Sequence, residues 1–241
     1  MSEKIAVHWF RQDLRIKDNP SLEAASKCDS FIPIYILDDT NSGEFKMGSA
    51  SRWWLYHSLN KLNESLGGSL RLFKGDPCEI LPKLIEDYSV SNVFWNRCYE
   101  PWRIDRDKKI KNELETNNII VESFCGSLLW EPWNISKDDG TPYRVFTPYY
   151  KKGCLNASEP RLPVSEPSLE NISKKDNVSD NLESLDLLPK SNWYAGFEEE
   201  WNPGEKGAEQ NLEEFLEHGL FNYKEGRNFP SQKFVSRLSP H

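Results

Sequence analysis

The first 125 residues alternate short apolar runs with segments of helical character, and this alternation constrains the fold more than any other feature. Apolar runs of this length are typical of buried strands, and the segments between them carry helix signals. Strands that are joined by helices pair in parallel, because each connection has to cross the sheet. The sequence therefore predicts an α/β domain around a doubly wound, five-stranded, Rossmann-like parallel sheet. The expected strands are residues 4–10, 31–37, 69–74, 91–96 and 119–124.

The connecting segments predict the helices. In residues 49–66, leucines recur at helical spacing on one face, and Gly67-Gly68 follow as a stop signal. A further helix is expected at 102–117, and two more are expected after Asn19-Pro20 and Asp76-Pro77, which combine an N-cap residue with a proline at the first helical position. Pro33 interrupts the second expected strand, so pairing of that strand is predicted to begin after it, because proline donates no ladder hydrogen bond.

Polar side chains follow the first and fourth strands, where a doubly wound sheet binds ligands. After the first strand, Arg11 and Asp13 are expected to form a surface salt-bridge loop, and binding of a polar ligand is the alternative. After the fourth strand, residues 99–107 mix aromatic rings with both charges. This mixture suits a planar, polar ligand, and it equally suits a helix start with Glu100 and Asp105 near the positive end of the helix dipole.

Four aromatic residues crowd into residues 143–150. We expect a packed segment that closes the sheet, with a stacking platform as the alternative. The composition then changes, because residues 154–191 are rich in Ser, Pro, Glu, Asn and Lys, as linkers are. Helical periodicity returns at 206–218, with its apolar side chains expected to face inward. The predicted organisation is an α/β domain at 1–150, a linker at 151–191 and the first helices of a truncated all-α domain at 192–241.

Charge and composition exclude several classes of protein. A net charge of −8 argues against a general nucleic-acid binder, although a local basic groove stays possible. The five cysteines form no CxxC pair and histidine is scarce, so we expect no metal site and reduced thiols in a cytoplasmic protein. No apolar run approaches the ~20 residues of a membrane span. The glycine-rich phosphate loops GxGxxG and GxxxxGK[ST] are absent.

Several long motifs in the same order resemble the DNA photolyase/cryptochrome family. They are residues 9–22 (WFRQDLRIKDNPSL), 75–77, 99–107, 145–149 and 201–241. The resemblance implies an N-terminal α/β domain that carries or borders a light-harvesting antenna chromophore, followed by a helical domain that binds FAD. In photolyases, the excited reduced flavin sends an electron to a pyrimidine dimer that is flipped out of the DNA. No catalytic side chain is expected, since the cofactor supplies the chemistry.

The resemblance also assigns roles to single residues. Tyr223 matches a tyrosine that contacts the flavin cofactor, and Arg227 matches an arginine that contacts a DNA phosphate. Val235 stands where photolyases often have threonine, which removes one hydroxyl contact. The loop that binds the FAD phosphates is expected to comprise Ser236, Arg237, Leu238 and Ser239.

The antenna site is defined less sharply by these motifs. Trp102-Arg103 stand where folate-binding members carry Asn-Glu, so the segment looks more like members that use a deazaflavin or that bind no antenna. The chromophore type stays undecided between a deazaflavin and a folate. The residues expected to line its pocket are Met47, Arg52, Glu100 and Asp105.

The function implied by the resemblance is that of a deoxyribodipyrimidine photolyase, a carbon–carbon lyase that repairs cyclobutane pyrimidine dimers in damaged DNA. The sequence ends within the FAD-phosphate motif, so we expect the N-terminal portion of such an enzyme, monomeric and inactive alone. One alternative is a cryptochrome photoreceptor. The other is a non-catalytic α/β module that binds a nucleotide or chromophore.

Overall fold

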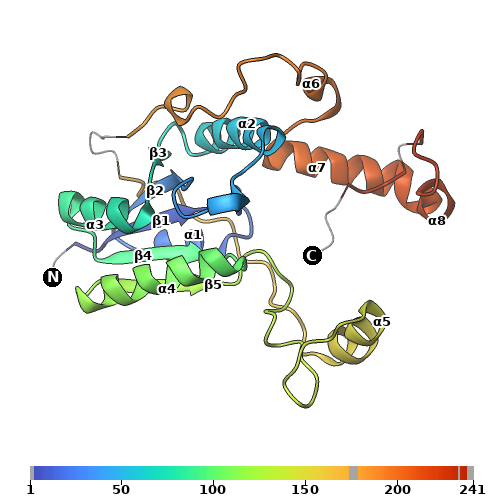
Figure 1. The fold of residues 1–241 in the computed structure, drawn as a ribbon, viewed down its shortest axis with the longest axis horizontal. Coiled ribbons are helices and arrows are strands. Elements are labelled where there is room, and N and C mark those ends of the chain that lie inside the picture. Colours follow the sequence, from blue (N-terminus) through green and yellow to red (C-terminus); the bar gives the residue numbers. More distant parts are fainter. Residues whose placement is uncertain (1–2, 174–178, 233, 238–241) are drawn as a thin grey trace.

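The computed structural model describes residues 3–173, 179–232 and 234–237, and a five-stranded parallel sheet lies at the centre of its N-terminal part (Figure 1). Its strand order is β3-β2-β1-β4-β5, which confirms the doubly wound sheet that the sequence predicts. The chain steps outward from β1 to β3 and then returns to the other side of β1, so the strand order reverses between β1 and β4. The strands are β1 (Ile5–Phe10), β2 (Ser30–Leu37), β3 (Arg71–Lys74), β4 (Asn92–Asn96) and β5 (Ile120–Phe124).

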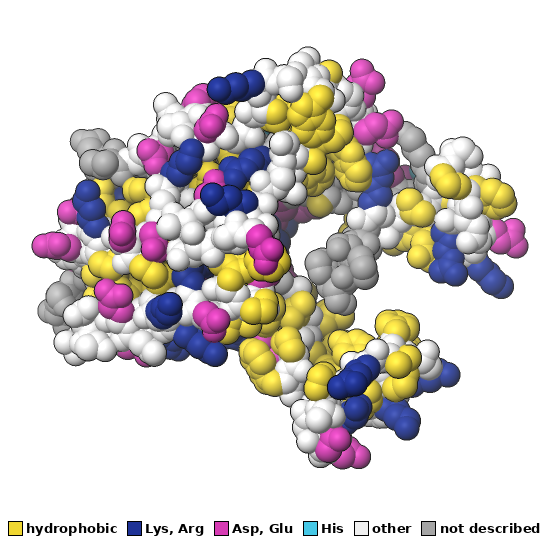
Figure 2. Space-filling view, in the orientation of Figure 1, with side chains coloured by type: hydrophobic (Ala, Val, Ile, Leu, Met, Phe, Trp, Pro, Cys, Tyr) yellow, Lys and Arg dark blue, Asp and Glu magenta, His cyan; other side chains and the backbone are white. Residues whose placement is uncertain are grey.

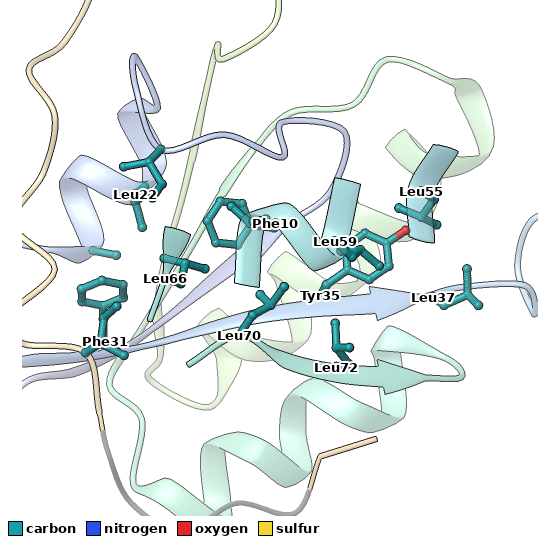
Figure 3. Packing of buried hydrophobic residues seen from close by; sticks show 14 of the residues in the cluster. Phe10, Leu22, Phe31, Tyr35, Leu37, Leu55, Leu59, Leu66, Leu70 and Leu72 are labelled. Carbon is teal, nitrogen blue, oxygen red and sulfur yellow. The ribbon is translucent and has the colours of Figure 1, made fainter. Parts of the chain in front are cut away.

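Two helices cover each face of the sheet. The helices α1 (Pro20–Ala25) and α2 (Ser49–Ser65) pack on one face, and α3 (Pro77–Tyr88) and α4 (Pro101–Thr116) pack on the other. Figure 1 shows α2 and α4 on opposite sides of the strands. The strand β2 serves both layers, because successive side chains point to opposite faces. Its odd-numbered residues Phe31, Tyr35 and Leu37 join the α2 leucines (Figure 3), and its even-numbered isoleucines join the α3–α4 layer.

The predicted helix caps are present. The side chain of Asn19 accepts a hydrogen bond from the backbone N–H of Leu22 at 3.2 Å, and Asp76 accepts one from Cys78 at 2.9 Å. Each cap satisfies a backbone donor that the first turn of a helix leaves without a partner. The short signals that were read from the sequence therefore fix where α1 and α3 begin.

The expectation that β2 pairs only after Pro33 is wrong, because β2 pairs with β1 from Ser30 onward. The N–H of Phe31 points away from β1, where it donates to the carbonyl of Asn171 at 3.1 Å. Backbone groups alternate sides along a strand, so the nitrogen of Pro33 faces the same way. On that side β3 pairs only from Ile34, and the missing donor therefore breaks no ladder hydrogen bond.

A lobe follows β5 and contains α5 (Phe146–Pro148), a π-helical turn (Tyr149–Gly153) and a 3₁₀ turn (Cys154–Asn156). The expectation that residues 143–150 close the sheet is wrong. Figure 1 shows α5 well away from the strands, and the Phe146 side chain is 74% exposed. Aromatic content alone predicted that this segment packs against the sheet, and among the described residues it does not.

The polar segment after the lobe runs back along the α/β domain. Ile172, Leu185 and Leu187 are buried in the layer that contains α2. Backbone bonds join Ser173 to Phe31 at 2.8 Å and Asp180 to Leu72 at 2.7 Å. A segment whose composition is typical of a linker is thus attached to the β2–β3 edge of the sheet, through a few apolar anchors and backbone pairs.

The C-terminal part is helical, as expected for residues 206–218. Its helices are α6 (Phe197–Glu200), α7 (Glu205–Glu214) and α8 (Tyr223–Gly226), with a π-helical turn at Phe215–Gly219. The expected inward-facing leucines of this segment are exposed instead, with Leu212 at 39% and Leu216 at 49%. Short 3₁₀ turns lie at Gly43–Phe45, Glu183–Leu185 and Leu220–Asn222.

Three further observations bear on the classes considered above. In the described part of the chain, no helix is long and apolar enough to cross a membrane. Over the same residues, no group of acidic, histidine and cysteine side chains is arranged to hold a metal ion. All five cysteines are free thiols.

His8 on β1 provides a test of the buried core. Burial lowers the pKa of its imidazole to about 4, and among the described residues only the Ser21 hydroxyl lies within hydrogen-bond distance of the ring, 3.3 Å from Nδ1. In the unfolded chain the pKa is about 6.5. Between these values only the unfolded chain takes up the proton, so stability is complete above about pH 6.5 and falls as the pH decreases. We expect His8 to account for a loss of about 2 kcal/mol between pH 6.5 and 5.0, measured by urea unfolding.

The matched variant is His8→Asn, which has no titrating group at this position. Its free energy of unfolding should decrease less over the same pH interval, whatever its stability at neutral pH. An equal decrease in both proteins would show that His8 does not carry the effect.

Candidate functional site

A cavity of about 610 Å³ lies beyond the carboxyl ends of β1 and β2, where the start of α4 and the start of α7 also meet. We call it the edge cavity. Its volume is in the range of small-molecule and cofactor sites, and it lies at the edge of the sheet where doubly wound folds bind ligands. Its lining includes Trp9, Arg11, Tyr35, Asp38, Asp39, Met47, Trp54, Trp102, Arg103, Arg106, Glu205 and Ala208.

Alternating tryptophan and arginine side chains form one wall of the edge cavity. The guanidinium of Arg106 lies 4.9 Å from the ring centroid of Trp9 and 5.2 Å from that of Trp102. On the other side, Arg11 lies 5.1 Å from the Trp9 ring. Guanidinium groups are attracted to the negative faces of aromatic rings, so these rings help to hold both arginines in place.

Buried carboxylates compensate these arginines. Asp38, which follows β2, accepts a hydrogen bond from Arg106 at 2.9 Å, and Asp107 accepts one from Arg106 at 2.8 Å and one from Arg11. The side chains of Arg106 and Asp38 are 5% and 4% exposed. Burial by itself lowers the pKa of Arg106, but the two carboxylates outweigh it and raise that pKa. The cluster is therefore a network of ion pairs inside the protein.

The expectation that Arg11 and Asp13 form a surface loop is wrong, because both residues are buried. Asp13 accepts a hydrogen bond from the Arg11 backbone at 2.9 Å and one from the side chain of Asn96. The Nε of Arg11 donates to the carbonyl of Asn96 at 3.0 Å. Since Asn96 ends β4, these bonds join β1 to β4 where the strand order reverses.

Two polar groups at the cavity wall lack a hydrogen-bond partner among the described residues: Trp9 Nε1 and Arg103 Nε. Arg103 lies 3.4 Å from Glu100 Oε1, without hydrogen-bond geometry. Its guanidinium also stacks on Trp102, with 4.9 Å to the ring centroid. A buried donor without an acceptor is costly, so the Arg103 guanidinium would gain from a ligand that brings polar acceptors. Together with the apolar side chains of Met47 and Trp54, Arg103 suits a planar ring system with polar substituents.

The start of α7 borders the edge cavity. The two carboxylate oxygens of Glu205 accept the backbone N–H groups of Ile16 and Lys17 at 3.0 and 2.9 Å, and Lys17 pairs with Glu209 at 2.6 Å. Nearby, Trp201 contacts Trp54 on α2, with 5.5 Å between ring centroids. These contacts place residues of the C-terminal part beside the site.

The predicted antenna residues do not all meet in the edge cavity. Met47 lines it. Arg52 does not line it, but binds both oxygens of Asp39 at 2.7 Å and the carbonyl of Met47 at 3.0 Å, and so fixes two residues that do. Glu100 lines a second cavity of about 1020 Å³ and accepts a hydrogen bond from Gln12 at 2.6 Å. Asp105 is exposed on α4 and lines neither cavity. The binding roles of these residues stay predictions.

The residues predicted to contact FAD, together with Arg227, which is predicted to contact DNA, fall into two groups. Tyr223 contacts Phe215, with 5.9 Å between centroids, and the guanidinium of Arg227 lies 5.4 Å from the Tyr223 ring. Arg237 instead stacks on Trp201 at 4.3 Å and donates to the Glu200 carbonyl at 3.0 Å, and its neighbour Ser236 is half-buried. Leu238 and Ser239 lie outside the described residues. None of the described members lines either of the two cavities described above.

Sequence reasoning missed the central part of the site. It singled out residues 99–107 as suited to a planar ligand, but assigned no role to Arg106 or Asp107, and it did not connect them with Asp38. The available signal was the position of each residue, because all three follow strands whose carboxyl ends share one edge of the sheet.

The buried network predicts a strong dependence on Arg106. We expect Arg106→Ala to lower the free energy of unfolding by about 3–5 kcal/mol, because Asp38 and Asp107 would remain as buried charges with one partner fewer. Arg52→Ala is the matched control, since Arg52 and Asp39 are 18% and 27% exposed, and its effect should be about 1 kcal/mol or less. Urea unfolding of both variants measures the difference, and equal effects would contradict the buried character of the network.

Comparison with known proteins gives consistent matches. The family model for DNA photolyase matches residues 6–168. A deoxyribodipyrimidine photo-lyase from Agrobacterium fabrum is 40% identical over 100% of this chain and 51% of its own length. Cryptochrome-2 from Arabidopsis thaliana is 33% identical, over 99% of this chain and 40% of its own length.

The fold comparison agrees with the sequence comparison. The crystal structure of a bacterial class III photolyase from Agrobacterium tumefaciens superimposes with a TM-score of 0.91 at 38% identity, and the match covers 100% of this chain and 50% of that one. The chain thus spans about half the length of the photolyases that it matches.

Proposed function

Since this chain belongs to the DNA photolyase family, we propose that it forms the N-terminal part of a light-dependent deoxyribodipyrimidine photolyase. The observation that carries the proposal is the similarity to the Agrobacterium photolyase, which extends over the whole chain and includes the segment with Tyr223 and Arg227. The proposed reaction is repair of cyclobutane pyrimidine dimers in DNA, for which bound FAD supplies the light-driven electron.

In this proposal the C-terminal segment serves the flavin and the DNA. Tyr223 contacts the flavin cofactor, and Arg237 with Ser236, Leu238 and Ser239 holds its phosphates. Arg227 binds a DNA phosphate. The exposure of Arg227 and its position on the Tyr223 ring support these roles, because one surface then presents a ring and a cation together.

The edge cavity is the proposed site of a light-harvesting antenna chromophore. Both chromophore classes considered, a deazaflavin and a folate, combine a planar ring with polar substituents. Trp102 and Met47 provide apolar contact for such a ring, and Arg103 provides a cation with an unused Nε donor. Of the four antenna residues predicted from sequence, Met47 is proposed to touch the chromophore, and Arg52 to position Met47 and Asp39.

The antenna proposal predicts binding by the 241-residue chain. We expect 8-hydroxy-5-deazariboflavin or 5,10-methenyltetrahydrofolate to bind, measured by titration of the fluorescence of each compound. Arg103→Ala should weaken the binding by about tenfold or more, because a charged donor is lost. Arg144→Ala is the matched control, since Arg144 is exposed and lies outside the edge cavity. Failure of both compounds to bind would remove the antenna role, and the tighter compound identifies the chromophore class.

A cryptochrome photoreceptor is the second candidate, favoured by the similarity to Arabidopsis Cryptochrome-2. The two candidates share a flavin and differ in repair. The decisive assay is therefore light-dependent reversal of a cyclobutane dimer in an oligonucleotide by the whole protein that contains this chain. Repair supports the photolyase, whereas a flavin-loaded protein without repair supports the photoreceptor.

The proposed role of Arg237 in binding FAD predicts that its substitution weakens FAD binding. In the whole protein, Arg237→Ala should weaken FAD binding by roughly tenfold or more, because a desolvated phosphate would lose its charged donor. Lys224→Ala is the control, as a neighbouring exposed cation with no assigned role. The 241-residue chain should retain negligible FAD, since it spans only about half the length of the photolyases that it matches. Stoichiometric FAD in that chain, measured by absorbance, would contradict this placement of the flavin site.

A further inference from the structure

The lobe formed by residues 130–158 has a small core of its own. At its base, Trp130 Nε1 donates a hydrogen bond to the carbonyl of Ser158 at 2.7 Å. Inside, a Cβ added at Gly153 would lie 2.6 Å from Ile135 and 3.2 Å from the Tyr143 ring, so only glycine fits there. The lobe is thus a packed unit. The side chains on its outer surface do not take part in this small core.

The lobe is also fixed to the sheet. Glu131 is buried at its base and accepts hydrogen bonds from Arg97 Nε and from the Tyr99 hydroxyl, both at 2.8 Å. Arg97 and Tyr99 directly follow β4. This buried contact sets the position of the lobe relative to the carboxyl end of the sheet.

The 130–158 lobe holds four cations and three carboxylates, and all three carboxylates lie before residue 140. Residues 140–158 contain three cations, Arg144, Lys151 and Lys152, and no aspartate or glutamate, although the whole chain has a net charge of −8. All three cations are exposed, and none forms an ion pair within the described ranges. Figure 2 shows dark-blue and yellow side chains gathered together on this lobe, at the lower right.

Aromatic rings accompany these cations. Phe146 stacks on Tyr150, with 5.9 Å between centroids and an interplanar angle of 6°. Phe146 remains 74% exposed and Tyr150 remains 46% exposed. A stacked aromatic pair in water, next to unpaired cations in a segment without carboxylates, is a surface suited to polyanions that carry planar rings.

We propose that the 130–158 lobe binds an unpaired stretch of DNA. Arg144, Lys151 and Lys152 contact its phosphates, and a base stacks on Phe146. Proteins that bind single strands combine cations along the backbone with aromatic rings under the bases. The charge of residues 140–158 is complementary to this partner. The inference rests on the proposed function, since dimer repair requires a base to leave the duplex, and it adds a second DNA contact surface to Arg227.

The test uses the 241-residue chain and a short fluorescein-labelled oligodeoxythymidylate, with affinity measured by fluorescence anisotropy over a series of KCl concentrations. Each phosphate contact contributes about 0.7 to the slope of log affinity against log salt for single strands. The double variant Lys151→Ala/Lys152→Ala should therefore reduce the slope by about 1.4. The matched control is Lys108→Ala/Lys109→Ala, two adjacent exposed lysines on α4, and should leave the slope unchanged.

Variants of Phe146 test the contribution of stacking separately from that of charge. Phe146→Ala should weaken oligonucleotide binding by about tenfold with an unchanged salt slope, and Phe146→Tyr should restore it, because stacking needs only the ring. If the lobe lysines and the α4 lysines have equal effects, or if Phe146→Ala has none, the lobe is not a DNA surface and its exposed rings serve another contact.

The repair assay distinguishes a failure of this inference from a failure of the proposed function. Repair by the whole protein, with loss of DNA affinity in Arg227→Ala and none in the lobe variants, would overturn the lobe proposal alone. Absence of repair, with the lobe effects present, would overturn the photolyase assignment and leave the lobe as a DNA-binding surface.

Discussion

The charged network between β1 and β4 holds the functional end of this fold together. In an open parallel sheet, the two strands at the reversal of order diverge toward helices on opposite faces, and their loops leave a crevice. Here Asn96, at the end of β4, binds both Arg11 and Asp13, which follow β1. Asn96 also donates to the Asn19 side chain at 2.8 Å, the residue that caps α1. One amide therefore links a strand end, a loop and a helix start.

The edge cavity depends on this network. Asp107 binds Arg11 and Arg106 together, and Arg106 is held between the rings of Trp9 and Trp102. Buried ions of this kind contribute little net stability, because desolvation offsets most of their attraction. Their effect is to permit only one arrangement, since any other leaves a charge without a partner. A cavity wall that is fixed in this way does not have to be ordered before a ligand binds, which supports the proposed antenna site.

Local signals predicted the elements of the fold, and long-range contacts decided what the sequence did not reveal. The caps Asn19 and Asp76 act within three residues, so they are readable from sequence. Pro33 was misjudged because its neighbours on the β3 side lie elsewhere in the chain. Arg11 was expected at the surface because its partners, Asn96 and Asp107, are 85 and 96 residues away. Residue types alone do not show that such distant groups will meet, and this meeting is what permits the burial of Arg11.

The distribution of charge also explains why net charge was a poor guide to partners. Eight glutamates and one lysine lie between residues 198 and 217, so this segment carries seven of the eight net negative charges. The remainder of the chain is almost neutral, and Arg144, Lys151 and Lys152 of the lobe lie outside the acidic segment. Fields of exposed charges decay over a Debye length of about 8 Å at physiological salt, so a polyanion responds to the surface that it approaches and not to the sum. A polyanion is repelled by the α6–α7 segment, and the DNA surface proposed on the lobe lies outside that segment.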